Sequence, residues 1–432
     1  MSLYIFFFLL IIYISIFVYI KLYFPFWSKQ PVVHFYDLYY MFNNFGIINC
    51  DLPKRNKYVN LLDIEVYKYD GNELLLCDCV NLNAVKNLMS NKSTNINNKE
   101  YLLNEFVMLI NNNYFRNAKI EGNRYEPLRN NIIPYFDCHK YYVFLSFYWI
   151  NDIIYDTKNN SYIYNRKHIG VMSSRPLQVY LFHKYKNEFI TFDIYYVDYL
   201  CVDKMHRGKN VASQIIQTHE YIQRHTNKNI SISLFKHEEN LLCIVPLCCF
   251  DSYCWSISDI LCLNKVVVDT SIYEIINMNP SNTYYFYQFI DENKNNFNLI
   301  VVPVITNLIE LVKSSNIIIT FLLDKTNRNV IAYYIFKNSC IYLDKNKKVL
   351  TCIASIKNNI LNEEIFIDGF IKSLSLFYRD YFYVSIEDIS ENNLFINYIR
   401  KNINHKVHNK NAYFFYNFAY QTFHNHNVFI IN

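Results

Sequence analysis

The chain has 432 residues, 52% of them hydrophobic, so it can build two or more domains and is not a largely disordered protein. Its net charge is only +5 and its lysines are scattered, which argues against a nucleic-acid-binding protein. Twelve cysteines without zinc-ligand spacing predict free thiols and no metal site. With 6 glycines in the chain, many turns must use Asn or Asp instead.

The chain begins with an uncharged apolar run from Leu3 to Ile20, which resumes after Lys21 and continues to Phe26. It is long enough for a transmembrane helix of ~20 residues, so we predict a single-pass anchor over residues 1–23. A cleaved signal sequence and a buried core helix are the alternatives. Lys21 and Lys29 follow the run, and the positive-inside tendency then places the remaining chain on the cytoplasmic face of a membrane.

An aromatic segment, Phe24-Pro-Phe-Trp-Ser-Lys-Gln-Pro-Val-Val33, follows the apolar run. On its own, Trp27 fits an aromatic belt at the membrane surface. In the following residues, alternation of apolar with polar side chains predicts strands, and apolar side chains at helical spacing predict helices. These are strands at Leu61–Tyr69 and Glu73–Val80, a short helix after them, a helix at Tyr101–Tyr114, and strands at Tyr141–Trp149 and His168–Leu181.

The stretch from Phe192 to Ser213 combines a strand, a basic turn and the start of a helix. Residues 196–202 are β-branched, aromatic and apolar, residues 203–210 break the strand, and a helical stripe runs from Val211 to about His225. The turn thus ends at a helix N-terminus flanked by Arg207 and Lys209, which suits a phosphate group. An ordinary strand-to-helix turn with solvated basic residues is the alternative.

A polar, Asn-rich interval, Asp269–Asn298, is the candidate boundary between two halves, each of which alternates strands and helices. The predicted elements around it are strands at Ile230–Phe235 and Leu299–Val304, a strand at Ile317–Leu323, a hairpin of Val330–Phe336 and Val349–Ser355, a helix at Glu364–Tyr378, a strand at Tyr381–Ile386 and an apolar tail at Val428–Ile431.

The segments just described resemble motifs of the N-myristoyltransferase family, whose fold is GNAT-like. Residues 198–213, DYLCVDKMHRGKNVAS, are similar to the family's NFLCVHKKLRSKRVAP, and residues 24–33 resemble FWDTQPVP. Residues 169–175, IGVMSSR, resemble the family's VGFISAIPA strand. Further similar segments follow in family order up to the terminal VFIIN, which corresponds to VGLVLQ. The resemblance therefore spans residues 24–432.

The chain departs from the family pattern at three places on the expected peptide side. Arg116-Asn-Ala-Lys119 stands where the family has an acidic run. Ser256 replaces a histidine after the motif tryptophan, and residues 402–410 replace a glycine-rich loop. Two other readings therefore stay open: a GNAT-like acyltransferase with a different acceptor, and a catalytically inactive descendant that binds acyl-CoA.

The resemblance implies two fused GNAT-like α/β halves with pseudo-two-fold symmetry and mixed, mostly antiparallel sheets flanked by helices. Residues 24–268 would bind acyl-CoA and residues 269–432 the peptide. The implied activity is transfer of a myristoyl group from myristoyl-CoA, a co-substrate and not a permanently bound cofactor, to the N-terminal glycine of a protein. A monomer is expected, with the membrane as a further partner and no nucleic acid.

The resemblance also assigns roles to individual residues. The backbone amides of Tyr199 and Leu200 would form the oxyanion hole, and the carboxylate of the C-terminal residue, Asn432, would be the base. A free, solvated C-terminus is the alternative for Asn432. The residues that would contact acyl-CoA are Phe26, Trp27, Tyr199, Leu200, Cys201, Val202, Arg207, Gly208, Lys209, Asn210, Val211 and Ala212.

Ser174, His206 and Asp198 are not read as a hydrolase triad, because no Gly-X-Ser-X-Gly turn exists.

Overall fold

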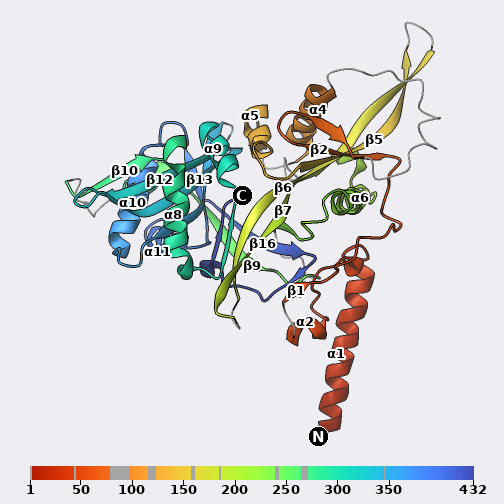
Figure 1. The fold of residues 1–432 in the computed structure, drawn as a ribbon, viewed down its shortest axis with the longest axis horizontal. Helices are drawn as coiled ribbons and strands as arrows, with labels where there is room; N and C mark the ends of the chain where they lie inside the picture. The colour runs from red at the N-terminus through yellow and green to blue at the C-terminus, as the bar shows by residue number, and fades with distance from the viewer. Residues whose placement is uncertain are drawn as a thin grey trace.

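The computed structural model describes residues 2–42, 45–77, 98–114, 123–156, 161–183, 186–238, 243–263, 271–344 and 346–432. Within these ranges, 16 strands form one mixed sheet that runs through the molecule, with helices packed on it (Figure 1). The helices are α1 Ser2–Tyr23, α2 Leu38–Phe42, α4 Asn98–Asn113, α5 Arg129–Ile132, α6 Val211–Thr226, α7 Ile257–Leu261, α8 Thr283–Asn293, α9 Ile305–Lys313, α10 Glu363–Ser375 and α11 Asn392–Arg400.

The strands fall on both sides of a central pair. Those of the first part of the chain are β2 Ile64–Tyr69, β3 Leu74–Leu76, β4 Arg124–Tyr125, β5 Val143–Asp156, β6 Ser161–His183, β7 Glu188–Val202, β8 Ser233–Glu238 and β9 Cys248–Ser256. Those of the second part are β10 Tyr273–Asn277, β11 Leu299–Val302, β12 Ile317–Asp324, β13 Asn329–Leu343, β14 Lys347–Lys357, β15 Tyr383–Glu387, β16 Val407–Tyr416 and β18 Val428–Ile430. A separate small sheet joins β1 Gly46–Ile47 to β17 Phe418–Ala419.

The same connection occurs once in each part of the sheet. Strands β7 and β8 are parallel and joined by the crossover helix α6, while β14 and β15 are parallel and joined by α10. The neighbours on the outer side of each pair are antiparallel hairpin strands, β5 and β6 in one part, β12 and β13 in the other. The two parts thus repeat one topology.

The two parts exchange a strand at the centre of the sheet. Strand β9 comes from the first part of the chain but pairs with β15, and β16 comes from the second part but pairs with β8. Strands β9 and β16 also pair with each other, antiparallel. The exchange makes one continuous sheet, so neither part could be removed without exposing strand edges of the other.

The parallel strands β7 and β8 pair only over a short length. Their register joins Tyr195–Val197 to Ser233–Phe235, and beyond these positions β7 continues beside β6 while β8 continues beside β16. The strands therefore separate from Asp198 onward. Backbone groups that would otherwise pair across the gap become available to a ligand.

The predicted elements agree with the structure, apart from their ends and one interval. Helix α6 and strands β7, β12, β13, β14 and β15 lie where the sequence predicts them. The hairpin of β5 and β6 is longer than predicted, extending to Asp156 and Ser161. The Asn-rich interval 269–298 contains β10 and α8, whose Phe286, Phe289 and Ile290 are buried. The helix predicted after Val80 lies outside the described residues.

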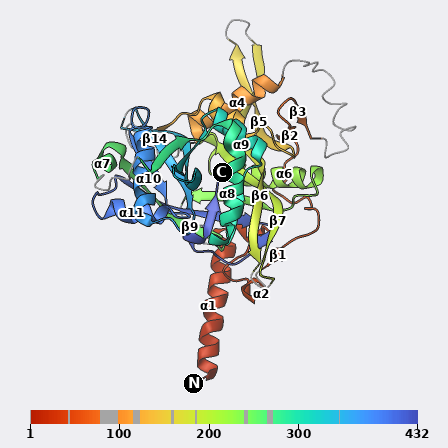
Figure 2. The same ribbon diagram turned by 60° about the vertical axis from the view of Figure 1, so that its left-hand side comes forward.

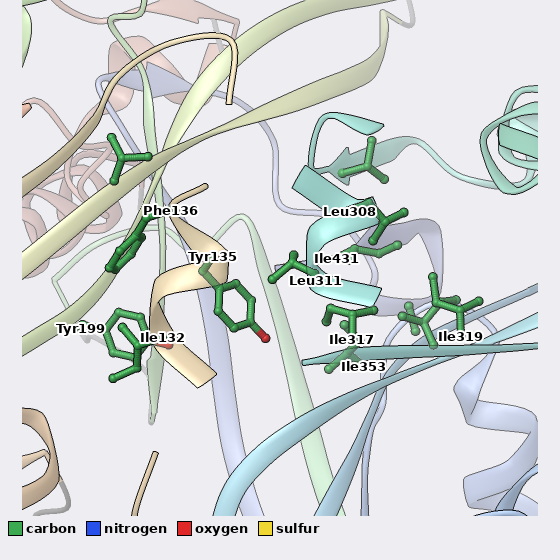
Figure 3. Packing of buried hydrophobic residues seen from close by; sticks show 14 of the residues in the cluster. Ile132, Tyr135, Phe136, Tyr199, Leu308, Leu311, Ile317, Ile319, Ile353 and Ile431 are labelled. Atoms are coloured by element: carbon green, nitrogen blue, oxygen red, sulfur yellow. The ribbon is translucent and has the colours of Figure 1, made fainter. Parts of the chain in front are cut away.

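The last strand carries the C-terminus into the molecule. Strand β18 pairs in parallel with β11, and Phe429 and Ile431 belong to the largest hydrophobic cluster. Figure 3 shows Ile431 and Leu311 on one side of Tyr135, with Ile132 on its other side. The C-terminus lies near the middle of the molecule in both ribbon views (Figures 1 and 2). It is not a free, solvated end.

Helix α1 projects away from the rest of the molecule (Figure 2). It is long and apolar enough to cross a membrane over Tyr4–Tyr23, and only 6% of its most apolar window is buried. Only its C-terminal end packs on the body. There Ile20 is buried against Val32, Ile244 and Tyr416, with Tyr13 at the edge of the same cluster.

Candidate functional site

A cavity of about 460 Å³ begins where β7 and β8 separate. Asp198, Tyr199 and Leu200 form one wall, and Phe235 to Glu238 form the wall facing them. One arm reaches Trp27, Met172 and Ile216 in the first part of the chain. The other reaches Lys337 to Ile341 and the C-terminal Asn432. A single cavity therefore connects the aromatic segment near the N-terminus with the end of the chain.

The wall at Tyr199 and Leu200 is a β-bulge. In the pairing of β6 with β7, Val171 faces Cys201 and Ser173 faces Asp198, so Met172 alone faces both Tyr199 and Leu200. Tyr199 has a φ of 52°, in the left-handed region, as the extra residue of a bulge can have. Its N–H donates to the Asp198 carboxylate at 2.8 Å. The bulge interrupts the pairing of β7 with β6 at the residues that line the cavity.

The basic turn follows β7 and leads into α6. Gly208 and Asn210 both have positive φ values, 78° and 59°, and the Asn210 side chain does not cap the helix. The N–H groups of the first helical turn consequently have no partner within α6. Lys209 is exposed beside them, whereas the Arg207 guanidinium donates to the carbonyls of Asn113 and Val202.

The apolar arm of the cavity is built from stacked rings. The Trp27 ring stacks on Phe235 at 5.6 Å with 16° between the planes, and Phe235 stacks on Phe414 at 5.3 Å. Phe26 is buried beside Trp27 and does not line the cavity. Neither Cys201 nor Val202 lines it. Burial raises the pKa of the Cys201 thiol to about 12, so it stays protonated.

Two titratable groups of α6 also face this arm. His219 is fully buried, with Nδ1 2.7 Å from the Ser146 hydroxyl and Nε2 2.8 Å from that of Ser174. Burial lowers the pKa of His219 to about 3, so the ring is neutral at pH 7. Burial raises the pKa of Glu220 to about 7, with Arg224 opposing the shift. Because the partners of His219 are two hydroxyls, Ser174 is not part of a hydrolase triad.

The terminal residue is fixed by its side chain. Asn432 is buried, and its Nδ2 donates to the hydroxyls of Tyr196 at 2.7 Å and Tyr413 at 2.9 Å. Burial raises the pKa of both tyrosines, so they remain protonated. These two hydrogen bonds hold the end of the chain beside the cavity.

Of the twelve residues expected to contact acyl-CoA, Trp27, Tyr199 and Leu200 line the cavity, as does the expected base Asn432. The residues from Arg207 to Ala212 lie outside it, at the end of β7. Six charged residues that were not predicted as part of the site also line the cavity: Asp198, Glu220, Lys236, Glu238, Lys337 and Glu387. The one available signal was a charge inside an otherwise apolar strand, as at Lys337.

Two of the three departures from the family motifs lie in the described part of the chain. Ser256 ends β9 and bonds Ser258, and it does not line the cavity. Residues 402–410 connect α11 to β16 and enter that strand. Residues 116–119 lie outside the described part of the chain.

No family model matches the sequence, and no curated protein matches it at the level of sequence. Solved structures do match the fold. A structure of Saccharomyces cerevisiae N-myristoyltransferase with bound myristoyl-CoA has a TM-score of 0.66 at 12% identity, covering 96% of this chain and 95% of that one. One of the same enzyme with myristoyl-CoA and inhibitors has a TM-score of 0.65 at 12% identity, covering 95% and 94%.

The repeated parallel strand pairs and the exchanged central strands define a protein of two fused GNAT-like α/β halves, as the sequence predicts. More narrowly, the likeness over nearly the full length of both chains shows that this chain has the N-myristoyltransferase fold. At 12% identity, the likeness concerns the fold and not the individual site residues.

Replacing Arg207 and Lys209 together by Ala should weaken the binding of CoA at least tenfold in titration calorimetry. Each charge-assisted phosphate contact contributes ~1.5–3 kcal/mol, and about 1.4 kcal/mol corresponds to tenfold. Because carbonyl groups already hold Arg207, we expect Lys209→Ala alone to cause most of the loss. Lys186→Ala, at an exposed lysine near the β6–β7 turn, is the control. Unchanged affinity for CoA in the double variant would show that the turn does not bind the CoA phosphates.

Proposed function

We propose that the protein transfers a myristoyl group from myristoyl-CoA to the N-terminal glycine amine of a protein substrate. The observation that carries the proposal is the single cavity, which brings the bulge at Tyr199 and Leu200 together with Asn432. The fold is that of an enzyme crystallised with myristoyl-CoA, which supports the same donor here. The donor is a co-substrate that leaves as CoA after transfer.

In this proposal the acyl donor lies along the first part of the chain, residues 24–268. The uncapped first turn of α6, with Gly208, Lys209 and Asn210, receives the CoA phosphates. The acyl chain enters the apolar arm beside Trp27. The second part, residues 269–432, supplies most of the wall against which the acceptor peptide lies.

The thioester carbonyl would accept hydrogen bonds from the amides of Tyr199 and Leu200. Backbone donors in a bulge are fixed before the reaction starts, so they stabilise the developing oxyanion without reorganising. In the unliganded chain the Asp198 carboxylate occupies the Tyr199 amide. On donor binding, the thioester carbonyl oxygen would take the place of this carboxylate at the Tyr199 amide.

The terminal carboxylate of Asn432 would take a proton from the glycine ammonium. An amine must lose a proton before it can attack, and a carboxylate within hydrogen-bond reach in a dry site can accept it. The side-chain hydrogen bonds to Tyr196 and Tyr413 position this end of the chain. The free amine then attacks the thioester carbon, the C–S bond breaks and an amide forms. The departing thiolate of CoA takes the proton that the attacking nitrogen loses, and the proton held by the Asn432 carboxylate is released to solvent.

The direct test is incubation of the full-length protein, in detergent micelles, with labelled myristoyl-CoA and a glycine-initiated peptide. Removal of residues 1–22 would also remove the buried Ile20, so the intact chain is preferable. We expect a mass increase of one myristoyl group on the glycine amine, and none on a peptide that starts with alanine. Turnover of neither peptide, with myristoyl-CoA bound, would favour an acyl-CoA-binding protein without activity.

Converting the Asn432 carboxylate to a carboxamide, by ligation of a synthetic C-terminal peptide, should slow the chemical step ~10²–10⁴-fold, the range for loss of a general base. The carboxamide keeps the shape of β18 and the side-chain hydrogen bonds of Asn432. Affinity for myristoyl-CoA should therefore be unchanged. The ligated chain with its native carboxylate is the control. A carboxamide protein with the normal single-turnover rate would place the base elsewhere.

We also propose that α1 anchors the protein in a membrane with the remaining chain on the cytoplasmic face. Deleting residues 2–12 leaves an apolar stretch far shorter than the ~20 residues needed to span a bilayer. The truncated protein should then stay in solution when liposomes are sedimented, while the intact protein sediments with them. Because Tyr13 and Ile20 remain, its thermal stability should not change. Sedimentation of both proteins would contradict an anchoring role for α1.

A further inference from the structure

Arg175 is a buried cation beside the cavity with no anion to pair with. Its side chain is 1% exposed, and all three guanidinium nitrogens lack a hydrogen-bond partner among the described residues. The guanidinium carbon lies 5.0 Å from the centre of the Tyr135 ring and 5.2 Å from that of Tyr196. Both rings line the cavity. Burying an unpaired charge is strongly unfavourable, so this arrangement needs a compensating group.

A second cation faces the same place from the other half of the sheet. Lys337, on β13, lines the cavity, and its ammonium lies 5.0 Å from the same Tyr135 ring. No ion pair within 4.0 Å joins it to a described carboxylate. Burial lowers the pKa of Lys337, and the charges of Asp198 and Glu387 oppose this shift while that of Arg175 adds to it. The Tyr135 hydroxyl is also without a partner in the described structure. Arg175 and Lys337 thus each lie 5.0 Å from the centre of one tyrosine ring whose hydroxyl is unpartnered.

Two other charged groups of the cavity, Lys236 and Asp198, have partners. Lys236 forms an ion pair with Glu387 at 2.6 Å, so this cation needs nothing further. Asp198 accepts from the Tyr199 amide. The terminal residue is held through its side chain, and no ion pair of its carboxylate with a described cation exists within 4.0 Å. Among the described residues, Arg175 and the Tyr135 hydroxyl thus have no hydrogen-bond partner, and Lys337 has no ion pair.

Arg175 departs from the family motif that its strand resembles. Within the segment that resembles the family motif VGFISAIPA, Arg175 occupies the position of the second isoleucine. Arg175 is therefore a charged residue in a strand whose other residues are mostly apolar and buried. A guanidinium pairs with a carboxylate through two parallel hydrogen bonds, a geometry that suits an acidic side chain.

We propose that Arg175 and Lys337 bind an acidic side chain of the acceptor peptide, a refinement that rests on the proposed function. Arg175 faces Tyr196 across the sheet, three residues before Tyr199. Three residues of a strand span about 10 Å, so an extended peptide whose glycine amine reaches the bulge would place its third or fourth residue near the two cations. The protein should thus select acceptors with Asp or Glu at one of these positions.

The test uses labelled octapeptides that begin with glycine and carry Glu, Ala or Lys at position three or four. Binding is measured by fluorescence anisotropy to the full-length protein in detergent, loaded with a non-hydrolysable myristoyl-CoA analogue. We expect Glu at one position to bind at least tenfold more tightly than Ala, and Lys more weakly still. Arg175→Met and Lys337→Met should each remove this preference. Arg379→Met, which removes an exposed arginine charge, should keep it.

Thermal unfolding of the unliganded proteins gives an independent readout. Because the guanidinium is unpaired, Arg175→Met should raise the melting temperature, and the Glu peptide should then stabilise only the wild type. A lower melting temperature in the variant would mean that water or the terminal carboxylate already satisfies Arg175, which overturns the proposal. Glycine peptides that bind and are acylated without preference for Glu would overturn this inference alone. A failure to bind or acylate any peptide would overturn the proposed function with it.

Discussion

The separation of two parallel strands determines how the rest of the site is arranged. Strands β7 and β8 pair over Tyr195–Val197 and then diverge, so the backbone from Asp198 onward has no partner on that side. The bulge at Tyr199 and Leu200 lies at the start of this gap, and the cavity fills it. Helix α6 begins just after β7 ends, which puts its uncapped N-terminus at the open end of the same gap. If the two strands did not diverge, backbone groups of β7 in this region would pair with β8.

The strand exchange at the centre explains why both ends of the chain reach this gap. Strand β16 pairs with β8, and its Phe414 continues the ring stack that starts at Trp27. The tail after β16 returns as β18 beside β11 and ends at the cavity. A site shared by residues about 400 positions apart can only be as stable as the whole sheet. We therefore regard the two halves as one structural unit.

The sequence predicted most of the elements, since β-branched and apolar runs specify strands such as β7, and apolar stripes specify helices such as α6. It also predicted that asparagine would replace glycine in turns, and Asn187, Asn210 and Asn417 have positive φ values. Pairing between distant strands could not be read from local patterns, so the exchange of β9 and β16 was not anticipated. For the same reason, nothing in the sequence indicated that Arg175 and Lys337 meet at one tyrosine ring.

We propose that the protein holds acyl-CoA with its thioester at the point where β7 and β8 separate. The most direct measurement is an experimental structure of the full-length protein with a non-hydrolysable myristoyl-CoA analogue. We predict that the acyl carbonyl oxygen will lie ~3 Å from the amide nitrogens of Tyr199 and Leu200. We also predict the pyrophosphate at the first turn of α6 and the alkyl chain beside Trp27. A carbonyl turned away from both amides, with the phosphates remote from α6, would contradict this proposal.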